Sequence, residues 1–409
     1  MLASRIDALL VPRSVEVFAR FLRLGLTSFG GPIAHVGYFR REFVERARWL
    51  DDGAFGEILA LCSVLPGPTS SQVGIVLGFG RAGTLGAFAA WLGFTLPSAL
   101  AMTIFGLWLR DQTRGDGTFA SGRVLAGITE GLLAAAAGVV ALAVVQLART
   151  FAATTAMRAI ALVALALALG LERLTPSLQW LPLLLGGAAG YVWLPPGTMP
   201  RGATALALPK RAAAIAATLF VVMLFALPIV APAGSALALF ARCFRAGALV
   251  FGGGHVVLPF LQGAIGPIVS ERTFFAGYGA AQAMPGPLST FAAFLGAASR
   301  VEPGGWVGAA IALAGIFAPS FLLLIVVVPL WRGVRELPRA SAVLAGVGAS
   351  VVGLLAAVFV NPIAVSLLHD RLGGVLAVAA FGVLCWTRAP AWAVVIGCAS
   401  AGGALAAAG

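Results

Sequence analysis

The chain contains many apolar runs of about 20 residues that charged side chains seldom interrupt. A helix of that length crosses the hydrocarbon core of a bilayer. The 409 residues are 60% hydrophobic and only 10% charged, whereas soluble domains are about 45–50% apolar and about 25% charged. The sequence therefore predicts an all-α polytopic membrane protein whose constant partner is the lipid bilayer. It excludes a soluble enzyme, a secreted scaffold and a nucleic-acid partner.

The apolar runs predict about thirteen transmembrane segments when each is compared with a span of about 20 residues. We expect an amphipathic helix over 34–50, because arginines and glutamates alternate there with aromatic residues. The segment 1–14 holds Arg5, Asp7 and Arg13 and no apolar core, so we expect no cleavable signal peptide. The expected segments are 15–31, 52–80 (interrupted), 82–109, 124–148, 153–171, 178–194, 212–232, 235–253, 273–299 (interrupted), 305–331, 341–360, 366–387 and 390–408.

An internal repeat divides the chain into two homologous halves. More than half of the segment 18–31 is identical to the segment 240–253 at an offset of 222. The match continues in the same order through a Pro-Gly-Pro motif that occurs at 66–68 and again at 285–287. It extends further through Pro97-Ser98 with Pro319-Ser320 and through the segments 124–127 and 343–346. We predict a first repeat over 15–194, a connector with a linker helix over 195–234, and a second repeat over 235–409.

The number of crossings per repeat decides how the halves are oriented. If each interrupted segment crosses the membrane, equivalent helices lie seven crossings apart, and the halves are inverted as in many secondary transporters. If the Pro-Gly-Pro segment dips in and returns, the halves run parallel. In the second half the loop charges favour inversion, because basic side chains are more frequent in the loops that would be cytoplasmic. In the first half the count violates this rule. We predict inverted repeats.

Four arginines lie inside apolar helices and are related two and two by the repeat. A charge near the centre of a bilayer costs about 2.5–3.5 kcal/mol on insertion scales, so each arginine needs an anionic partner or a function. For Arg20 the partner could be Glu16, one turn earlier, whereas 235–253 contains no acid. Guanidinium groups also bind tetrahedral oxyanions through two hydrogen bonds in one plane. We predict anion recognition, with structural pairing as the alternative, for Arg20, Arg23, Arg242 and Arg245.

Each Pro-Gly-Pro motif must interrupt its helix near the middle of a span. Proline removes a backbone hydrogen bond and is well placed in the first turn of the half-helix that follows. The start of that half-helix presents free N–H groups and a positive dipole end, which suits an anion. Matching broken helices in two repeats indicate a transport site, although a structural kink is the alternative. The predicted substrate-binding residues here are Gly67, Thr69, Ser70, Ser71, Gly286, Ser289 and Thr290.

Glycine runs end both arginine helices and permit close approach of a ligand to the backbone. We add these glycines to the predicted substrate-binding set: Gly30, Gly31, Gly252 and Gly253. Four titratable residues nearby are candidates for carrying a coupling proton: Glu57, Glu130, His35 and His255. Alternatively, the two acids neutralise Arg20 or Arg23 and the histidines are structural.

At these motifs the chain resembles the chromate ion transporter family in its long, two-domain form. The resemblance rests on the run Phe29 to His35, on Glu42-Phe43-Val44 with Trp49-Leu50, and on both Pro-Gly-Pro motifs, and it covers roughly 15–150 and 235–360. It implies multi-pass insertion in the bacterial inner membrane and chromate efflux, driven by the membrane potential or a proton gradient, that confers chromate resistance. The second half departs from the family pattern at Gly254-His255.

The residues themselves favour a secondary transporter for a tetrahedral dianion such as chromate or sulfate. A natural oxyanion cargo other than chromate is the first alternative, and an anion channel is a weaker one. An intramembrane enzyme such as a chromate reductase is disfavoured, because we find no cofactor motif, metal cluster or paired thiols among the four scattered cysteines. The sequence implies no cofactor and leaves open the coupling ion, with protons a candidate, and the oligomeric state, with a homodimer one option.

Overall fold

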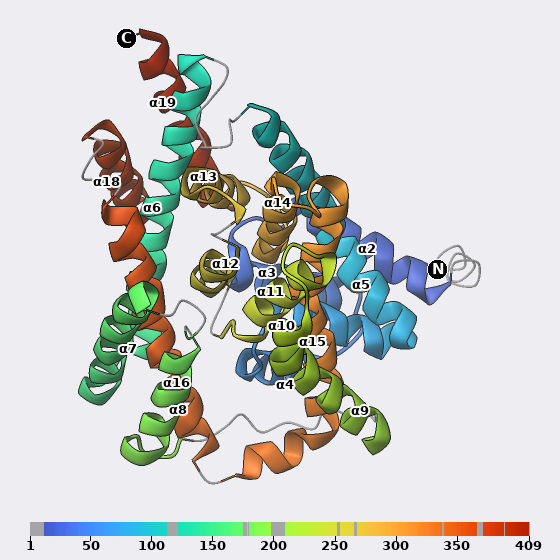
Figure 1. Ribbon diagram of the computed structural model, residues 1–409. Coiled ribbons are helices and arrows are strands. Elements are labelled where there is room, and N and C mark those ends of the chain that lie inside the picture. Colours follow the sequence, from blue (N-terminus) through green and yellow to red (C-terminus); the bar gives the residue numbers. More distant parts are fainter. Residues whose placement is uncertain are drawn as a thin grey trace.

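The computed structural model describes residues 12–112, 122–174, 178, 180–197, 209–251, 254–265, 268–337, 339–365, 371–387 and 389–408. All the regular elements in these ranges are helical, which confirms the all-α fold class (Figure 1). Six helices are long and apolar enough to cross a membrane by length and composition, and several shorter apolar helices accompany them. The chain is therefore a multi-pass membrane protein. The six are Thr69–Gln112, Arg123–Phe151, Lys210–Val230, Gly305–Leu330, Ala340–Ala364 and Ala391–Ala408.

A similar succession of helices lies on either side of a linker helix. The linker is continuous from Lys210 to Val230 and consists of α9 (Lys210–Val221), η3 (Val222–Ala226) and α10 (Leu227–Val230). The first half comprises α2 (Arg13–Thr27), α3 (Gly31–Phe39), η1 (Arg40–Arg46), α4 (Asp52–Val64), α5 (Thr69–Gln112), α6 (Arg123–Phe151), α7 (Thr155–Leu174) and α8 (Leu181–Trp193). The second comprises α11 (Ala236–Ala248), η4 (Gly254–Val256), α12 (Val257–Ile265), α13 (Glu271–Gln282), η6 (Leu288–Thr290), α14 (Phe291–Ala298), α15 (Gly305–Glu336), α16 (Ala340–Val358), η7 (Phe359–Ala364), α18 (Arg371–Trp386) and α19 (Ala391–Ala408).

Local sequence sets the ends of the helices next to the repeat motifs. Asp51, Ser235 and Ser270 each accept a hydrogen bond from the backbone N–H three positions later, and so cap α4, α11 and α13. In α5 the backbone leaves the helical region at Ala82 and Gly83, where Gly83 has a φ of 64°. The half-helix that follows the first Pro-Gly-Pro motif therefore ends there, and α5 turns back along itself, with Gly78 against Gly86.

Two short segments differ from the sequence-based expectation. The single amphipathic helix predicted over 34–50 is replaced by α3 and the π-helical η1, whose turn buries Glu42 and Phe43. The extra residue in a π turn shifts the helix face, which periodicity alone does not reveal. In the second half, α12 was not predicted, because a short buried helix does not register as a span.

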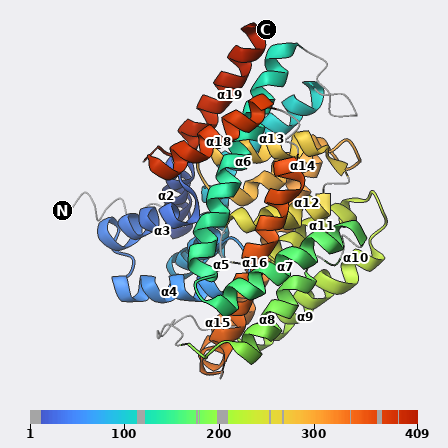
Figure 2. The same cartoon turned by 90° about the vertical axis from the view of Figure 1, so that its left-hand side faces the viewer.

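The helices form two bundles, each built from both halves. The first elements of each half, α2–α5 and α11–α15, form what we call the core bundle, and α6–α8 with α16–α19 form the outer panel (Figures 1 and 2). In the panel α6 packs against α18 and α19 of the second half, and α16 packs against α7 and α8 of the first. Small residues permit this close packing, with Gly127 against Gly402 and Gly346 against Gly186. The reciprocal pairing indicates a pseudo-two-fold relation between the halves.

A pair of single-cysteine variants tests the predicted inversion. Asp111 and Leu337 are exposed and stand near the equivalent ends of α5 and α15. We place Asp111→Cys or Leu337→Cys in a background without Cys62, Cys243, Cys385 and Cys398. If the halves are inverted, a membrane-impermeant maleimide labels one variant in intact cells and the other only after permeabilisation. Labelling of both from the same side would show parallel repeats.

Candidate functional site

The two Pro-Gly-Pro motifs meet the opposite half of the chain through reciprocal backbone hydrogen bonds. The Gly67 N–H donates to the Val250 carbonyl at 2.7 Å, and the Gly286 N–H donates to the Ser28 carbonyl at 2.9 Å. Ser28 and Val250 are repeat equivalents, and each directly precedes a Phe-Gly-Gly run. Each helix break thus finds its acceptor where the arginine helix of the other half ends. We call this region the crossing.

Only glycine fits the middle position of each motif. Gly67 has a φ of 124° and Gly286 a φ of 91°, which side chains rarely tolerate. A Cβ at Gly67 would lie 2.5 Å from the Ser320 Oγ, and one at Gly286 would lie 2.9 Å from the Ser98 Oγ. Ser98 and Ser320 are the buried serines of the two Pro-Ser motifs. The sequence shows these serines as a repeat match but does not indicate that they contact the opposite motif.

Buried polar side chains of the first half lie in the elements that form the crossing. His35 is 1% exposed, and its ring nitrogens lie 3.2 Å from the Ser70 Oγ and 3.2 Å from the Ser28 carbonyl oxygen. The Gln72 amide donates to the Pro66 carbonyl at 2.7 Å. Several buried polar atoms in this part of the described chain have no hydrogen-bond partner: the Oγ atoms of Ser28 and Ser71, the Gln72 Oε1 and the Thr95 Oγ1. Because buried polar groups are nearly always paired, these atoms are candidates for contacting a ligand.

The remaining predicted glycine and hydroxyl residues occupy several environments. Gly30 and Gly31 have φ values of 102° and 75° at the start of α3. Ser289 and Thr290 are buried in η6, and the Thr290 hydroxyl donates to the Pro287 carbonyl at 2.9 Å. Thr69 is half-buried at the start of α5. Gly252 and Gly253 lie outside the described residues.

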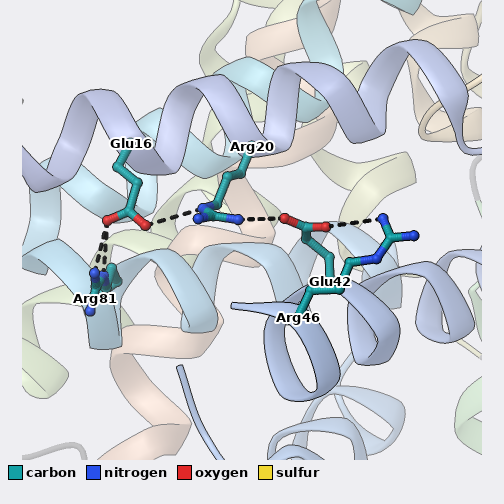
Figure 3. Close-up of polar contacts among 5 residues, drawn as sticks. All are labelled: Glu16, Arg20, Glu42, Arg46 and Arg81. Atoms are coloured by element: carbon teal, nitrogen blue, oxygen red, sulfur yellow. Dashed lines mark hydrogen bonds and ion pairs between the residues drawn. The ribbon is translucent and has the colours of Figure 1, made fainter. Parts of the chain in front are cut away.

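Arg20 lies in a chain of ion pairs of alternating charge (Figure 3). Its Nε is 3.1 Å from Glu16 and its Nη1 is 2.6 Å from Glu42. Arg81 binds the other oxygen of Glu16 at 2.9 Å, and Arg46 lies 3.7 Å from Glu42. The pairing alternative for Arg20 is therefore present in the structure. Sequence periodicity indicates Glu16 as a partner, but it does not indicate Glu42, which lies on the π-helical turn of another element.

The other three arginines have different surroundings. Arg23 is exposed on α2, and its side chain forms no hydrogen bond or ion pair with the described part of the chain. Arg242 and Arg245 together line a cavity of about 360 Å³ at α11 and α12, where the Arg242 Nη1 donates to the Ala264 carbonyl at 3.2 Å. The residues lining this cavity do not include Arg20 or Arg23, so the structure does not gather all four arginines at one cavity.

The candidate proton carriers are dispersed. Glu130 pairs with Arg272 at 3.4 Å, so it does not neutralise Arg20 or Arg23. Glu57 is half-buried in α4 and forms no ion pair within the described residues. His255 lies 2.9 Å from the Tyr278 hydroxyl through its Nδ1. Of the four candidates, His35 is the one with a hydrogen bond to a crossing residue within the described chain, the Ser28 carbonyl. Across the described ranges, no group of three or more His, Cys, Asp and Glu residues could hold a metal ion.

Replacing the crossing glycines tests their steric role. Gly67→Ala and Gly286→Ala each force a side chain into left-handed backbone, which costs about 1–2 kcal/mol, and into contact with a buried serine. We expect both variants to melt at lower temperature in detergent than the parent protein. Gly56→Ala is the control, because a Cβ at this helical position would meet no atom within 4 Å. An unchanged melting temperature for Gly67→Ala would contradict the geometry.

A double-mutant cycle measures the ion pair between Arg20 and Glu42. The side chains are 35% and 11% exposed, so we expect a coupling free energy on the order of 1 kcal/mol. Arg20→Gln and Glu42→Gln are combined, and thermal unfolding of the four proteins is compared. Arg13→Gln, an exposed position on the same helix, serves as a control and should show no coupling to Glu42→Gln. Additive effects at Arg20 and Glu42 would show that the pair contributes nothing.

Comparisons with known proteins agree with the family resemblance noted from the sequence motifs. The model of the chromate transporter family matches residues 15–191 and again residues 237–403. A chromate transport protein of Pseudomonas aeruginosa is 33% identical over 85% of this chain and 80% of its own length. One of Cupriavidus metallidurans is 28% identical over 82% and 79%. An uncharacterised transporter of Methanocaldococcus jannaschii is 26% identical over 86% and 84%. No solved structure matches significantly.

Proposed function

The chain belongs to the chromate transporter family, and we propose that it is a secondary transporter that exports chromate across the bacterial inner membrane and confers chromate resistance. Two relatives that match most of the chain are named chromate transport proteins. Membership of this family supports chromate as the substrate. The direction, the driving force and the residues that bind chromate are the parts that we propose.

The crossing is the single observation that carries the proposal. The helix break of each half meets the opposite half there, and the hydroxyls of Ser28, Ser71 and Thr95, in the elements that form the crossing, are buried and have no partner in the described chain. A tetrahedral dianion accepts hydrogen bonds on four oxygens, and hydroxyls and free backbone N–H groups at helix starts supply such donors without a full charge. We infer that chromate passes the crossing and exchanges its hydration shell for these groups.

The division into two bundles suits alternating access. In secondary transporters with repeated halves, one bundle rocks against the other around a central site. Here the core bundle holds the crossing, and the outer panel is tied together by reciprocal contacts between the halves. We propose that the core bundle moves against the panel, with the repeats over 15–194 and 235–409 related by inversion and joined by the connector over 195–234.

The membrane potential favours export of a dianion. With the cell interior negative, moving two negative charges outward gains about 4.6 kcal/mol per 100 mV. Uptake of the same dianion would need cotransported cations to overcome this potential. Among the candidates for a coupling proton, His35 bonds the Ser28 carbonyl of the crossing, whereas Glu57, Glu130 and His255 form no hydrogen bond or ion pair with the crossing residues in the described chain.

Flux into proteoliposomes tests the function. Uptake of radiolabelled chromate is measured at three potassium diffusion potentials: positive inside, zero and negative inside. Liposomes without protein are the blank. We expect saturable uptake that an interior-positive potential accelerates and sulfate inhibits. Sulfate transported more efficiently than chromate would assign it as the natural cargo. Saturable flux indifferent to the potential would contradict electrogenic export, and non-saturating flux would indicate a channel.

Hydroxyl variants test whether the substrate passes the crossing. Ser71→Ala and Thr95→Val remove buried oxygens that have no partner in the described chain, so each should lower chromate flux by about tenfold, equivalent to about 1.4 kcal/mol of lost interaction, with little change in melting temperature. Ser63→Ala is the matched control, because this exposed hydroxyl donates only to the Leu59 carbonyl of its own helix. Wild-type flux in both Ser71→Ala and Thr95→Val would place the path elsewhere.

A further inference from the structure

The two halves differ in what faces their first arginine. In the first half the Arg20 guanidinium is held by the carboxylates of Glu16 and Glu42. At the offset that relates Arg20 to Arg242, the equivalent positions are Ala238 and Ala264. The structure supports this equivalence, because Arg242 hydrogen-bonds the backbone of Ala264. The second half therefore has the arginine and neither of its acids.

A cavity occupies the space that those carboxylates would fill. Ala238 and Ala264 both line the cavity of about 360 Å³ that Arg242 and Arg245 also line. That volume equals the share of about a dozen water molecules in the liquid. Apolar side chains complete the wall, among them Phe260 of α12 and Trp180, which directly precedes α8 of the outer panel. The cavity thus lies where the core bundle faces the panel.

The charge balance of this cavity favours an anion. None of the described residues that line it is acidic. Glu302 lines a smaller neighbouring cavity on Arg242, but it forms no ion pair with that arginine within the described residues. The one hydrogen bond of the Arg242 guanidinium in the described chain goes to a neutral carbonyl, which leaves donors of the planar fork for an oxyanion. The equivalent arginine in the first half already has two carboxylates.

We propose that this second-half arginine cavity captures the oxyanion, which takes the place of the two missing carboxylates, and that the first half binds no anion at Arg20. The ligand is a tetrahedral dianion of the chromate or sulfate class. The proposal rests on the proposed function and deepens it, because it assigns the charged capture step to one half and leaves the neutral crossing as the path. The repeat thus holds a structural ion-pair site in one copy and a ligand site in the other.

Restoring a missing carboxylate tests the proposal. Equilibrium dialysis measures the binding of labelled chromate to the purified full-length protein in a neutral detergent. Ala264→Glu places an acid where Glu42 stands in the first half, so it should weaken chromate binding at least tenfold. Ala264→Gln, of equal size and without charge, should stay within about threefold of the parent. Equal binding by Ala264→Glu and Ala264→Gln would overturn the proposal.

Melting temperatures show whether the introduced glutamate takes the place of the oxyanion or disrupts the fold. The introduced glutamate should raise the melting temperature of the unliganded protein as chromate does for the parent, and chromate should then add no further stabilisation. If Ala264→Glu does not fold, chromate binding by Arg242→Gln tests the proposal instead. This variant should lose at least tenfold in chromate affinity, and Arg20→Gln should retain the parent affinity. Parent-like binding by Arg242→Gln, or loss by Arg20→Gln alone, would overturn the assignment.

Competition identifies the source of the bound oxyanion. Sulfate should displace chromate from the parent protein, and phosphatidylglycerol in mixed micelles should not. Displacement by phosphatidylglycerol and not by sulfate would make the cavity a lipid headgroup site and overturn the proposal. A transport assay distinguishes failure of the proposed transport function from failure of the proposed binding cavity. Binding that depends on the charge at 264 without any flux refutes the transporter and leaves the cavity, whereas flux with parent-like binding by Arg242→Gln refutes the cavity alone.

Discussion

Two backbone hydrogen bonds, from Gly67 to the Val250 carbonyl and from Gly286 to the Ser28 carbonyl, join the two halves at their helix breaks within the core bundle. Each Pro-Gly-Pro motif leaves its helix with backbone groups that must find partners elsewhere, since a buried unpaired amide is costly. Neither half provides the partner for its own glycine. These two N–H groups are therefore satisfied only when both repeats are folded against each other, and Ser320 and Ser98 each lie beside the glycine of the opposite motif.

The same framework carries different charges in its two copies. In the first, charged side chains from α2, η1 and α5 neutralise one another around Arg20. In the second, alanines stand in place of the two acids, and an open cavity appears beside Arg242. Small neutral residues thereby give one repeat a capacity for anions that the other lacks. A duplicated fold supplies geometry twice, whereas the side chains that line it determine which copy can receive a charged ligand.

Local patterns explain what the sequence could predict. Apolar runs set by bilayer thickness indicated the fold class and most helix positions, and proline fixed both helix breaks. The acceptors for the two motif glycines could not be predicted, because the Ser28 and Val250 carbonyls carry no side-chain signature and each lies in the opposite half of the chain. Glu42 was missed as a partner of Arg20 because a π-helical turn presents it. Ala238 and Ala264 stand where the first half has Glu16 and Glu42. This difference between the repeats was the one sequence feature that pointed to the cavity.

The most direct test of this unequal division is to locate chromate itself. Anomalous diffraction at the chromium edge, from crystals of the full-length protein grown with chromate, marks each bound ion without reference to any variant. We predict a peak within hydrogen-bonding distance of the Arg242 guanidinium and none beside Arg20, where Glu16 and Glu42 already fill the site. A peak beside Arg20, or equal peaks at both arginines, would contradict it.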